Sequence, residues 1–228
     1  MKQLQLSAVL YGSDSNDFLS ANVKLRTGGD TGCNPVGPNW VDAEFASPAN
    51  VNVTETPVGC ATNDFFLGVQ GSTGFGVTLI GSIGGYAKAA AVYHCPADKS
   101  VDPTRKMARN RSCSMNSYVD GTGLGGMQAP PFRVFKRFSD FGSALSASDC
   151  FVLLDENPAS INDGWFSYSA DGNGMGDRPA INHGNLSSFS YADGHVQLYK
   201  WQDCFLTYTS SGSGVDTKWL AQHGTYLK

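Results

Sequence analysis

The sequence predicts an α+β fold, in which an N-terminal helix precedes a mostly antiparallel sheet with long Gly-rich loops. Three local patterns carry this prediction. Residues 2–11 place four apolar side chains at helical spacing. The apolar run at 150–154 is typical of a buried strand. Residues 188–191 and 195–201 flank an Asp-Gly turn, as the two arms of a β-hairpin do.

The length allows one elaborated domain or two small ones, and the composition favours a loop-rich, secreted-type protein. Charged residues make up only 16%, against about 25% in a typical domain, and 27 residues are Gly. The net charge of -4 argues against nucleic acid or an anionic membrane surface as a partner. No apolar run approaches the roughly 18 residues that span a bilayer.

The helix predicted at 2–11 has a stop signal but no start signal. Gly12 to Asp17 form a turn-rich stretch, whereas no N-cap residue precedes Met1. This pattern favours a native chain that continues upstream. A genuine start with a frayed first turn is the alternative.

Further elements are expected along the chain. Residues 27–64 are rich in Gly, Pro and Asn and predict a loop-dominated insert, and residues 77–93 carry a second helical pattern that Gly84-Gly85 interrupts. Residues 134–141 alternate apolar and polar side chains, as a strand does. The tail beyond residue 203 alternates polar and aromatic side chains, which predicts a terminal strand or a cover segment.

Six cysteines occur in the chain, and none forms a Cys-x-x-Cys pair. The low charge favours an oxidising compartment with up to three disulfides, and six buried thiols are the alternative. The sequence leaves the connectivity open. We expect Cys95 to pair with Cys113 across a polar loop, a closure that would stabilise the fold by about 3 kcal/mol in the chain-entropy model.

His183, Asp193 and His195 are candidate zinc ligands, because two imidazoles and a carboxylate suit that metal. The nine residues between His183 and Asp193 do not fix whether the two side chains lie on the same face of the fold. A structural role is therefore favoured, in which Asp193 bonds the turn backbone and His183 caps a loop.

Asp155 and Glu156 follow the predicted buried strand and lie close in sequence to Asn162, Asp163 and Gly164. Two carboxylates at a strand end suggest an acid/base pair or a hard-cation site, although turn chemistry and solvated acids also explain them. The sequence contains no Gly-x-Ser-x-Gly elbow, His-Glu-x-x-His helix or phosphate-binding loop.

The stretch 171–177 partly matches a calcium-binding loop, with Asp171, Asn173 and Asp177 as candidate ligands. It departs from the EF-hand pattern because Met175 cannot ligate and Asn182 replaces the bidentate Glu. A looser calcium loop and a plain Gly-rich loop both remain open.

Five sequence blocks resemble one family. In order they are KQLQLSAVLYGSDSNDFLSANV, GYAKAAAVYHCPADKS, RNRSCSMNSYV, DCFVLLDENPASINDGWF and RPAINHGNLSSFSYADGHVQLYKW. Together they resemble the prepilin-type, pseudopilin-like proteins with a His-x9-Asp-Gly C-terminal domain, which are numerous in Verrucomicrobia, Lentisphaerae and Planctomycetes. The naming motif falls on His183, Asp193 and Gly194. The other matches fall on Cys95 to Asp98, Ser114 to Asn116, and Asp155 to Gly164.

This resemblance implies a pilin-like fold, with a helix packed on an antiparallel sheet. Family members begin with a basic leader, a peptidase site and about 20 apolar residues that anchor the subunit in the membrane. The chain, residues 1–228, would then be a single globular head, with 1–18 as the remainder of a longer helix, 27–75 as a variable loop-rich insert and 150–202 as the C-terminal sheet with the His-x9-Asp-Gly motif. Cys113 stands where an aromatic residue is expected, which fits the Cys95–Cys113 bridge.

The function implied is that of a non-enzymatic subunit of a type II secretion or type IV pilus-like system. Its partners would be other pseudopilin subunits and secretion-system components. It would be anchored in the inner membrane before assembly and would lie in the periplasm or at the cell surface. No cofactor is implied except calcium, which major pseudopilins often bind in a C-terminal loop and which adds to the case for the loop at 171–177.

Two other functions remain open. A secreted carbohydrate- or surface-binding module would use aromatic side chains as stacking platforms, with Trp40, Trp165, Trp201 and Trp219 as candidates. A metal-dependent hydrolase would use His183, Asp193 and His195.

Overall fold

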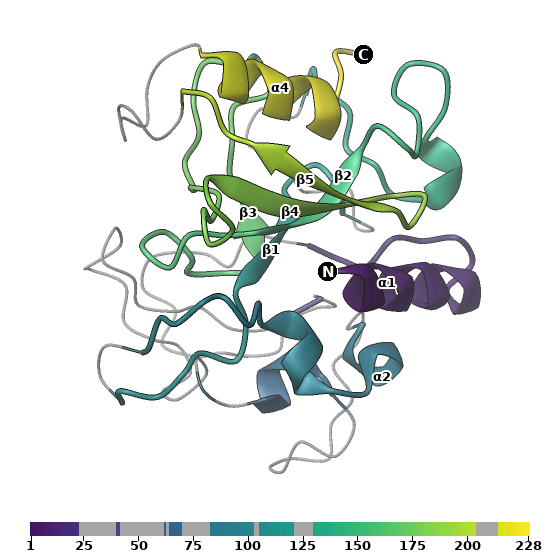
Figure 1. Cartoon of the computed structure of the whole chain (residues 1–228). Coiled ribbons are helices and arrows are strands. Elements are labelled where there is room, and N and C mark those ends of the chain that lie inside the picture. The colour runs from purple at the N-terminus through teal and green to yellow at the C-terminus, as the bar shows by residue number, and fades with distance from the viewer. Residues whose placement is uncertain are drawn as a thin grey trace, which may run out of the picture.

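A five-stranded sheet lies between two helical layers in the computed structural model (Figure 1). The structure describes residues 1–22, 40–41, 62, 64–69, 83–102, 105–120, 130–203 and 214–228. The strands are β1 (Cys113–Asn116), β2 (Phe151–Asp155), β3 (Trp165–Phe166), β4 (Leu186–Tyr191) and β5 (Val196–Lys200). They are arranged in the order β3-β1-β2-β4-β5. Only the β1–β3 pair is parallel, so the predicted α+β class with a mostly antiparallel sheet is confirmed.

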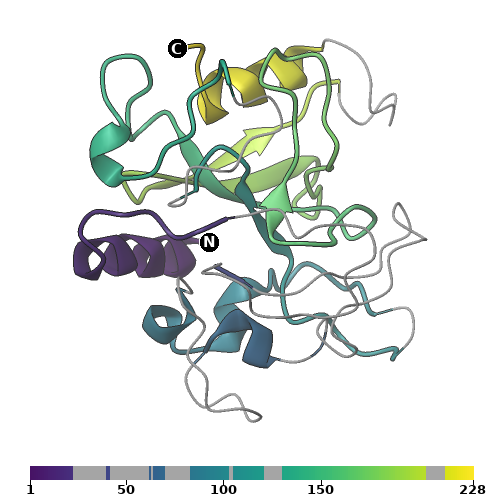
Figure 2. The same cartoon turned by 180° about the vertical axis from the view of Figure 1, so that it is seen from behind.

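The sheet separates two hydrophobic cores. Helix α1 (Lys2–Asp14) covers one face and helix α4 (Val215–Gly224) covers the other, and Figure 2 shows the same layers from behind. Successive residues of β2 serve both sides: Val152 packs in the core beneath α1, whereas Phe151 and Leu154 pack in the core beneath α4. Burial on both faces explains why β2 is a continuous apolar run.

Helix α1 confirms the helix predicted at the start of the chain and ends at Asp14. Its buried stripe of Leu4, Ala8 and Gly12 has the four-residue spacing of one helical face. Gly12 is needed there, because a Cβ would overlap the ring of Phe138. Among the described residues, no helix combines the length and apolarity required to cross a bilayer.

A short helical layer flanks α1. It contains α2 (Gly84–Ala87) and a 3-10 helix, η3 (Ala90–Tyr93), so the helical pattern predicted over 77–93 is confirmed within its described part, 83–93, but the interruption predicted at Gly84-Gly85 is wrong. Gly84 begins α2 instead of breaking a helix. A Cβ at this position would overlap the backbone of Leu67 and Gly68. The close approach of the two backbones therefore requires a glycine here.

Two further sequence predictions need correction. Residues 134–141 form isolated bridges and a 3-10 helix, η4 (Phe138–Asp140), instead of a strand. In the described part of the tail, α4 covers one face of the sheet, so the predicted cover segment is confirmed and the alternative of a terminal strand is wrong; Leu220, Ala221 and Gly224 are buried at helical spacing. The hairpin is confirmed, with Gly194 at φ 94° between β4 and β5. The predicted insert over 27–75 falls largely outside the described residues. The described part of this range contains one helix, η2 (Asp64–Leu67).

Asn116 ties the end of β1 to three other parts of the fold. Its Nδ2 donates to the carbonyl of Phe151 at 2.9 Å and to that of Gly224 at 3.0 Å. Its Oδ1 accepts from the Tyr118 amide at 3.0 Å and from the Tyr168 hydroxyl at 2.9 Å. These contacts use both donors and both lone pairs of a fully buried amide.

Replacing Asn116 by Ala should lower the free energy of unfolding by about 3 kcal/mol, because it leaves buried backbone and hydroxyl groups without partners. Urea denaturation measures the change. Gln197→Ala, at an exposed position of β5, is the matched control and should stay within about 0.5 kcal/mol of wild type. Equal stabilities for the two variants would contradict a central role for Asn116.

Candidate functional site

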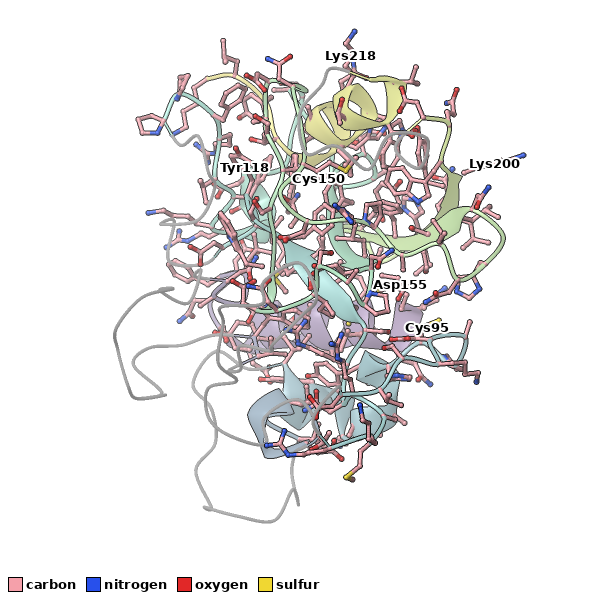
Figure 3. All side chains as sticks on the ribbon, turned by 90° about the vertical axis from the view of Figure 1, so that its left-hand side faces the viewer. Cys95, Tyr118, Cys150, Asp155, Lys200 and Lys218 are labelled. Atoms are coloured by element: carbon pink, nitrogen blue, oxygen red, sulfur yellow. The ribbon has the colours of Figure 1, made fainter. Side chains whose placement is uncertain are left out.

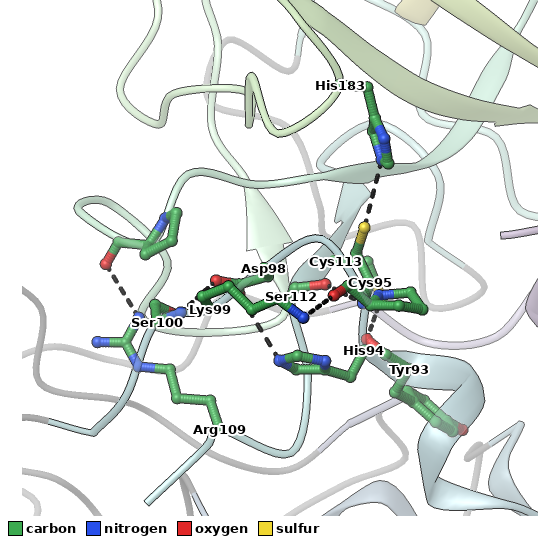
Figure 4. Close-up of polar contacts among 12 residues, drawn as sticks. Tyr93, His94, Cys95, Asp98, Lys99, Ser100, Arg109, Ser112, Cys113 and His183 are labelled. Atoms are coloured by element: carbon green, nitrogen blue, oxygen red, sulfur yellow. Dashed lines mark hydrogen bonds and ion pairs between the residues drawn. The ribbon is translucent and has the colours of Figure 1, made fainter. Parts of the chain in front are cut away.

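Cys95, Asp155 and His183 meet beside the end of β2. The Cys95 Sγ lies 3.3 Å from the His183 Nε2, and that nitrogen lies 4.0 Å from the Asp155 Oδ2. All three ligand atoms lie within 4.8 Å of one another. Within the described ranges, this is the one group of three or more His, Cys, Asp or Glu side chains with metal-binding proximity. Figure 3 shows Cys95 beside Asp155, and Figure 4 shows His183 pointing at Cys95.

Sheet register brings these three residues together. Asp155 ends β2 opposite Cys113 of β1, and Ser112 just before β1 accepts the Cys95 amide on its Oγ at 2.7 Å. His183 lies in the segment leading into β4, which pairs with β2 on its other side. The carbonyl of Asp155 also accepts the Ala180 amide at 2.8 Å, which holds this segment against the strand end.

The three side chains differ in exposure. Asp155 is only 7% exposed and Cys95 is half-buried, whereas the His183 side chain is 37% exposed. Burial raises the pKa of Asp155 to about 6, while His183 acts in the opposite direction. The group therefore has a buried carboxylate on one side and access to solvent on the other.

The geometry favours a ligand set over a nucleophile with its base. In a catalytic triad, the imidazole uses one ring nitrogen for the nucleophile and the other for the acid. Here both the Cys95 sulfur and the Asp155 oxygen lie near the same nitrogen, Nε2 of His183. Three donor atoms that surround a common point suit a cation.

A second polar cluster lies in the interior next to this group. Arg111 is fully buried, and its Nη1 donates to the Cys113 carbonyl at 2.8 Å, while its Nη2 donates to the Asp163 carbonyl at 2.5 Å. Ser114 accepts from Arg111 at 3.2 Å and donates to the Glu156 Oε2 at 2.5 Å. Ser160 donates to the other oxygen of Glu156 at 2.9 Å.

Glu156 carries the most perturbed carboxyl group of this cluster. Burial and the neighbouring Asp177 raise its pKa well above the ordinary value, while Ser114 and Arg111 lower it. Glu156 is only 1% exposed, so its carboxyl group has no open approach for a substrate. Its contacts therefore indicate a structural role.

The predicted pairing of Asp155 with Glu156 is wrong. Asp155 faces Cys95 and His183, whereas Glu156 faces Ser114 and Ser160, because adjacent residues of an extended chain point to opposite sides.

The segment Asn162 to Gly164 contributes mainly through its backbone. Asn162 and Asp163 present carbonyls to Arg111, and the Gly164 carbonyl accepts the Trp40 indole N–H at 3.0 Å. The Asp163 carboxylate accepts the Trp165 amide at 2.9 Å, in agreement with the turn interpretation.

His183, Asp193 and His195 do not form one metal group among the described residues. Asp193 lies at the hairpin turn, where its Oδ1 accepts the His195 amide at 3.0 Å and contacts the His195 Nδ1 at 2.6 Å. The predicted turn role of Asp193 is confirmed, with Gly194 supplying the positive φ. His183 faces Cys95 and Asp155 instead of capping a loop.

The predicted Cys95–Cys113 disulfide is wrong for this structure, in which both residues are free thiols. The Cys113 Sγ donates to the Tyr93 carbonyl at 3.3 Å, whereas the Cys95 Sγ faces His183. The loop between the cysteines does not reveal that each sulfur has another partner in the fold.

The predicted calcium loop stays a prediction. Asp171 is exposed and accepts the Asn173 amide at 3.0 Å, as an Asx turn does. Asp177 is buried, accepts the Ser167 amide at 2.7 Å and lies near Glu156. The two carboxylates thus have different environments.

The tryptophans proposed as stacking platforms are mostly interior residues. Trp40, Trp165 and Trp201 are buried, and Trp219 is half-buried and stacks on Tyr199 with ring centroids 3.8 Å apart. These side chains build the cores and do not present a row of open aromatic faces.

Sequence reasoning missed Arg111 and Ser114 as cluster members and Cys95 as a partner of His183. The available signal was that each residue lies in or beside one of the five resembling blocks. Their separations match no local ligand spacing, so only strand register reveals the contacts.

No model of a known family, no curated protein and no solved structure matches this chain.

Replacing Arg111 by Met should lower the free energy of unfolding by about 3–5 kcal/mol, because the buried acceptors of Cys113, Asp163 and Ser114 would lose their donor and Glu156 would lose a nearby positive charge. Adding Glu156→Gln to that variant should recover at least about 1 kcal/mol, since a neutral amide needs no counter-charge. Urea denaturation of both single variants and the double variant measures the coupling.

Lys218→Met is the control for this cycle, because Lys218 is exposed on α4, and it should change stability by less than about 0.5 kcal/mol. Strictly additive costs of Arg111→Met and Glu156→Gln would show that the two groups do not compensate each other.

Proposed function

We propose that this chain is the head of a pilin-like subunit that assembles into a pseudopilus or pilus. The proposal combines the family resemblance of five sequence blocks with a helix packed on an antiparallel sheet. In this proposal α1 is the C-terminal part of a longer helix whose apolar half anchors the subunit in the inner membrane. The role is mechanical, through contacts with other subunits and secretion-system components, in the periplasm or at the cell surface.

The observation that carries the proposal is a second apolar stripe on α1. Leu6 and Leu10 are 56% and 44% exposed and are four residues apart, on the side away from the buried Leu4 and Ala8. A helix with apolar side chains on both sides can pack one face on its own sheet and the other face on a second protein surface. In a helical filament core, that second surface would be the same helix of a neighbouring subunit.

The arrangement of the resembling blocks gives further support. Cys95, Asp155 and His183 come from three different blocks and lie together, while Ser114 contacts Glu156 across two of them. The blocks therefore describe one connected part of a fold. The alternative of a carbohydrate-binding module has less support, because three of its four candidate tryptophans are buried.

Replacing Leu6 and Leu10 together by Ser should reduce recovery of sheared filaments by about tenfold or more. Each leucine contributes about 1.5–3 kcal/mol when it becomes fully buried, and about 1.4 kcal/mol corresponds to a tenfold change in association. Quantitative immunoblotting of the filament fraction measures the effect, with the melting temperature of the isolated head expected to be unchanged.

The matched control replaces Leu198 and Val215 by Ser, since both are 53% exposed but lie on β5 and α4. This control should assemble normally. Equal assembly of the α1 variant and the control would argue against α1 as the contact surface.

Mass spectrometry of the native protein from its membrane or filament fraction should find an N-methylated residue and about 20 apolar residues ahead of Lys2. The measurement is made on protein from its own source. A native mature start at Met1 would contradict filament assembly and would favour the secreted binding module.

A further inference from the structure

We propose that Cys95, Asp155 and His183 bind a zinc ion, with a fourth coordination position open to solvent. This inference is independent of filament assembly, because it concerns the isolated head. It also differs from the calcium loop and from the hydrolase triad considered on sequence, since it combines one residue of each of three separate segments.

The spacing of the donor atoms fits a tetrahedral zinc ion. Zinc bonds of about 2.3 Å to sulfur and about 2.0–2.1 Å to nitrogen place those two atoms about 3.6 Å apart, and the corresponding nitrogen–oxygen separation is about 3.4 Å. The observed separations are 3.3 Å for Cys95 to His183 and 4.0 Å for His183 to Asp155. Small rotations of partly exposed side chains close the difference.

The donor types select zinc over the hard cations. Calcium and magnesium prefer shells of oxygen ligands, whereas a thiolate, an imidazole and a carboxylate are the three side-chain ligand types of zinc. On binding, the Cys95 thiol releases its proton to solvent while zinc bonds to the thiolate. The thiolate and the Asp155 carboxylate then balance the two positive charges of the ion, so the partly buried site carries no net charge.

The surroundings hold the ligands and leave an entrance. Asp155 is fixed at the end of β2, and the backbone of Cys95 is fixed by its amide bond to Ser112 at 2.7 Å. His183 has a side chain that is 37% exposed, so an ion can reach the Nε2 from solvent. Water or a carboxylate of another molecule can complete the tetrahedron.

The test uses the full chain, stripped of metal with a chelator and titrated with zinc chloride in a reducing buffer. One zinc should bind per chain, and at 100 times the dissociation constant the melting temperature should rise by about 5–10 °C. Cobalt should give tetrahedral d–d bands together with a sulfur-to-cobalt charge-transfer band.

Three variants remove one ligand each: Cys95→Ser, Asp155→Asn and His183→Gln. Each should weaken zinc binding by at least about 100-fold, and Cys95→Ser should also abolish the charge-transfer band although the other five cysteines remain. His183→Gln decides the test if the buried Asp155 variant does not fold, because His183 is partly exposed and its variant can be checked by circular dichroism.

Matched controls are Cys113→Ser and His94→Gln. Cys113 bonds the Tyr93 carbonyl, and His94 lies beside Cys95 in sequence but faces Asp98 at 3.8 Å (Figure 4). Both controls should bind zinc like wild type. Zinc binding that is unchanged in Cys95→Ser and His183→Gln, a cobalt spectrum without a sulfur band, or no binding at all would overturn the proposal.

Discussion

A fully buried guanidinium is the constraint on which this fold depends. Arg111 carries its charge at every physiological pH, so folding must surround it with acceptors. The structure supplies the carbonyls of Cys113 and Asp163, and Ser114 links the guanidinium to the Glu156 carboxylate. These groups come together only when β1 lies between β2 and β3. A buried guanidinium that loses these acceptors is costly, so the cluster penalises other strand arrangements.

The same register creates the candidate metal group on the other side of the strand end. Ser112 accepts the Cys95 amide on its side chain and the Glu156 amide on its carbonyl, so one residue positions members of both clusters. Asp155 and Glu156 are neighbours in sequence but point to different partners, one partly open to solvent and one closed. Two consecutive acids at the end of a strand can thus supply a ligand to one site and a buried hydrogen-bond acceptor to another.

Local patterns predicted the elements whose burial follows from their own sequence. The start of the chain became α1, the run at 150–154 became β2, and the Asp-Gly turn became the β4–β5 hairpin. For the tail, the cover segment was the correct alternative, whereas its alternating aromatic residues wrongly suggested a strand. Its residues Leu220 and Gly224 pack at helical spacing instead, and α4 covers a face of the sheet that no local pattern reveals. The contact between Cys95 and His183 had the same limit, since strand register brings them together across 88 positions.

The metal group and α1 are connected through the elements that hold the helix. On one side, Tyr86 of α2 stacks edge-on against Tyr11 and donates to Asp14 at 3.0 Å. On the other side, Ser190 of β4 donates to the buried Gln5 at 2.9 Å. Cys95 follows the helical layer that contains α2 and η3, and His183 precedes β4. A zinc ion bound to both residues would therefore link the two parts of the fold that contact α1. This link would resist separation of the α2/η3 layer from β4 when force is applied along α1. In the proposed filament, load would pass along α1, and the proposed zinc ion would then link the segments that hold this helix.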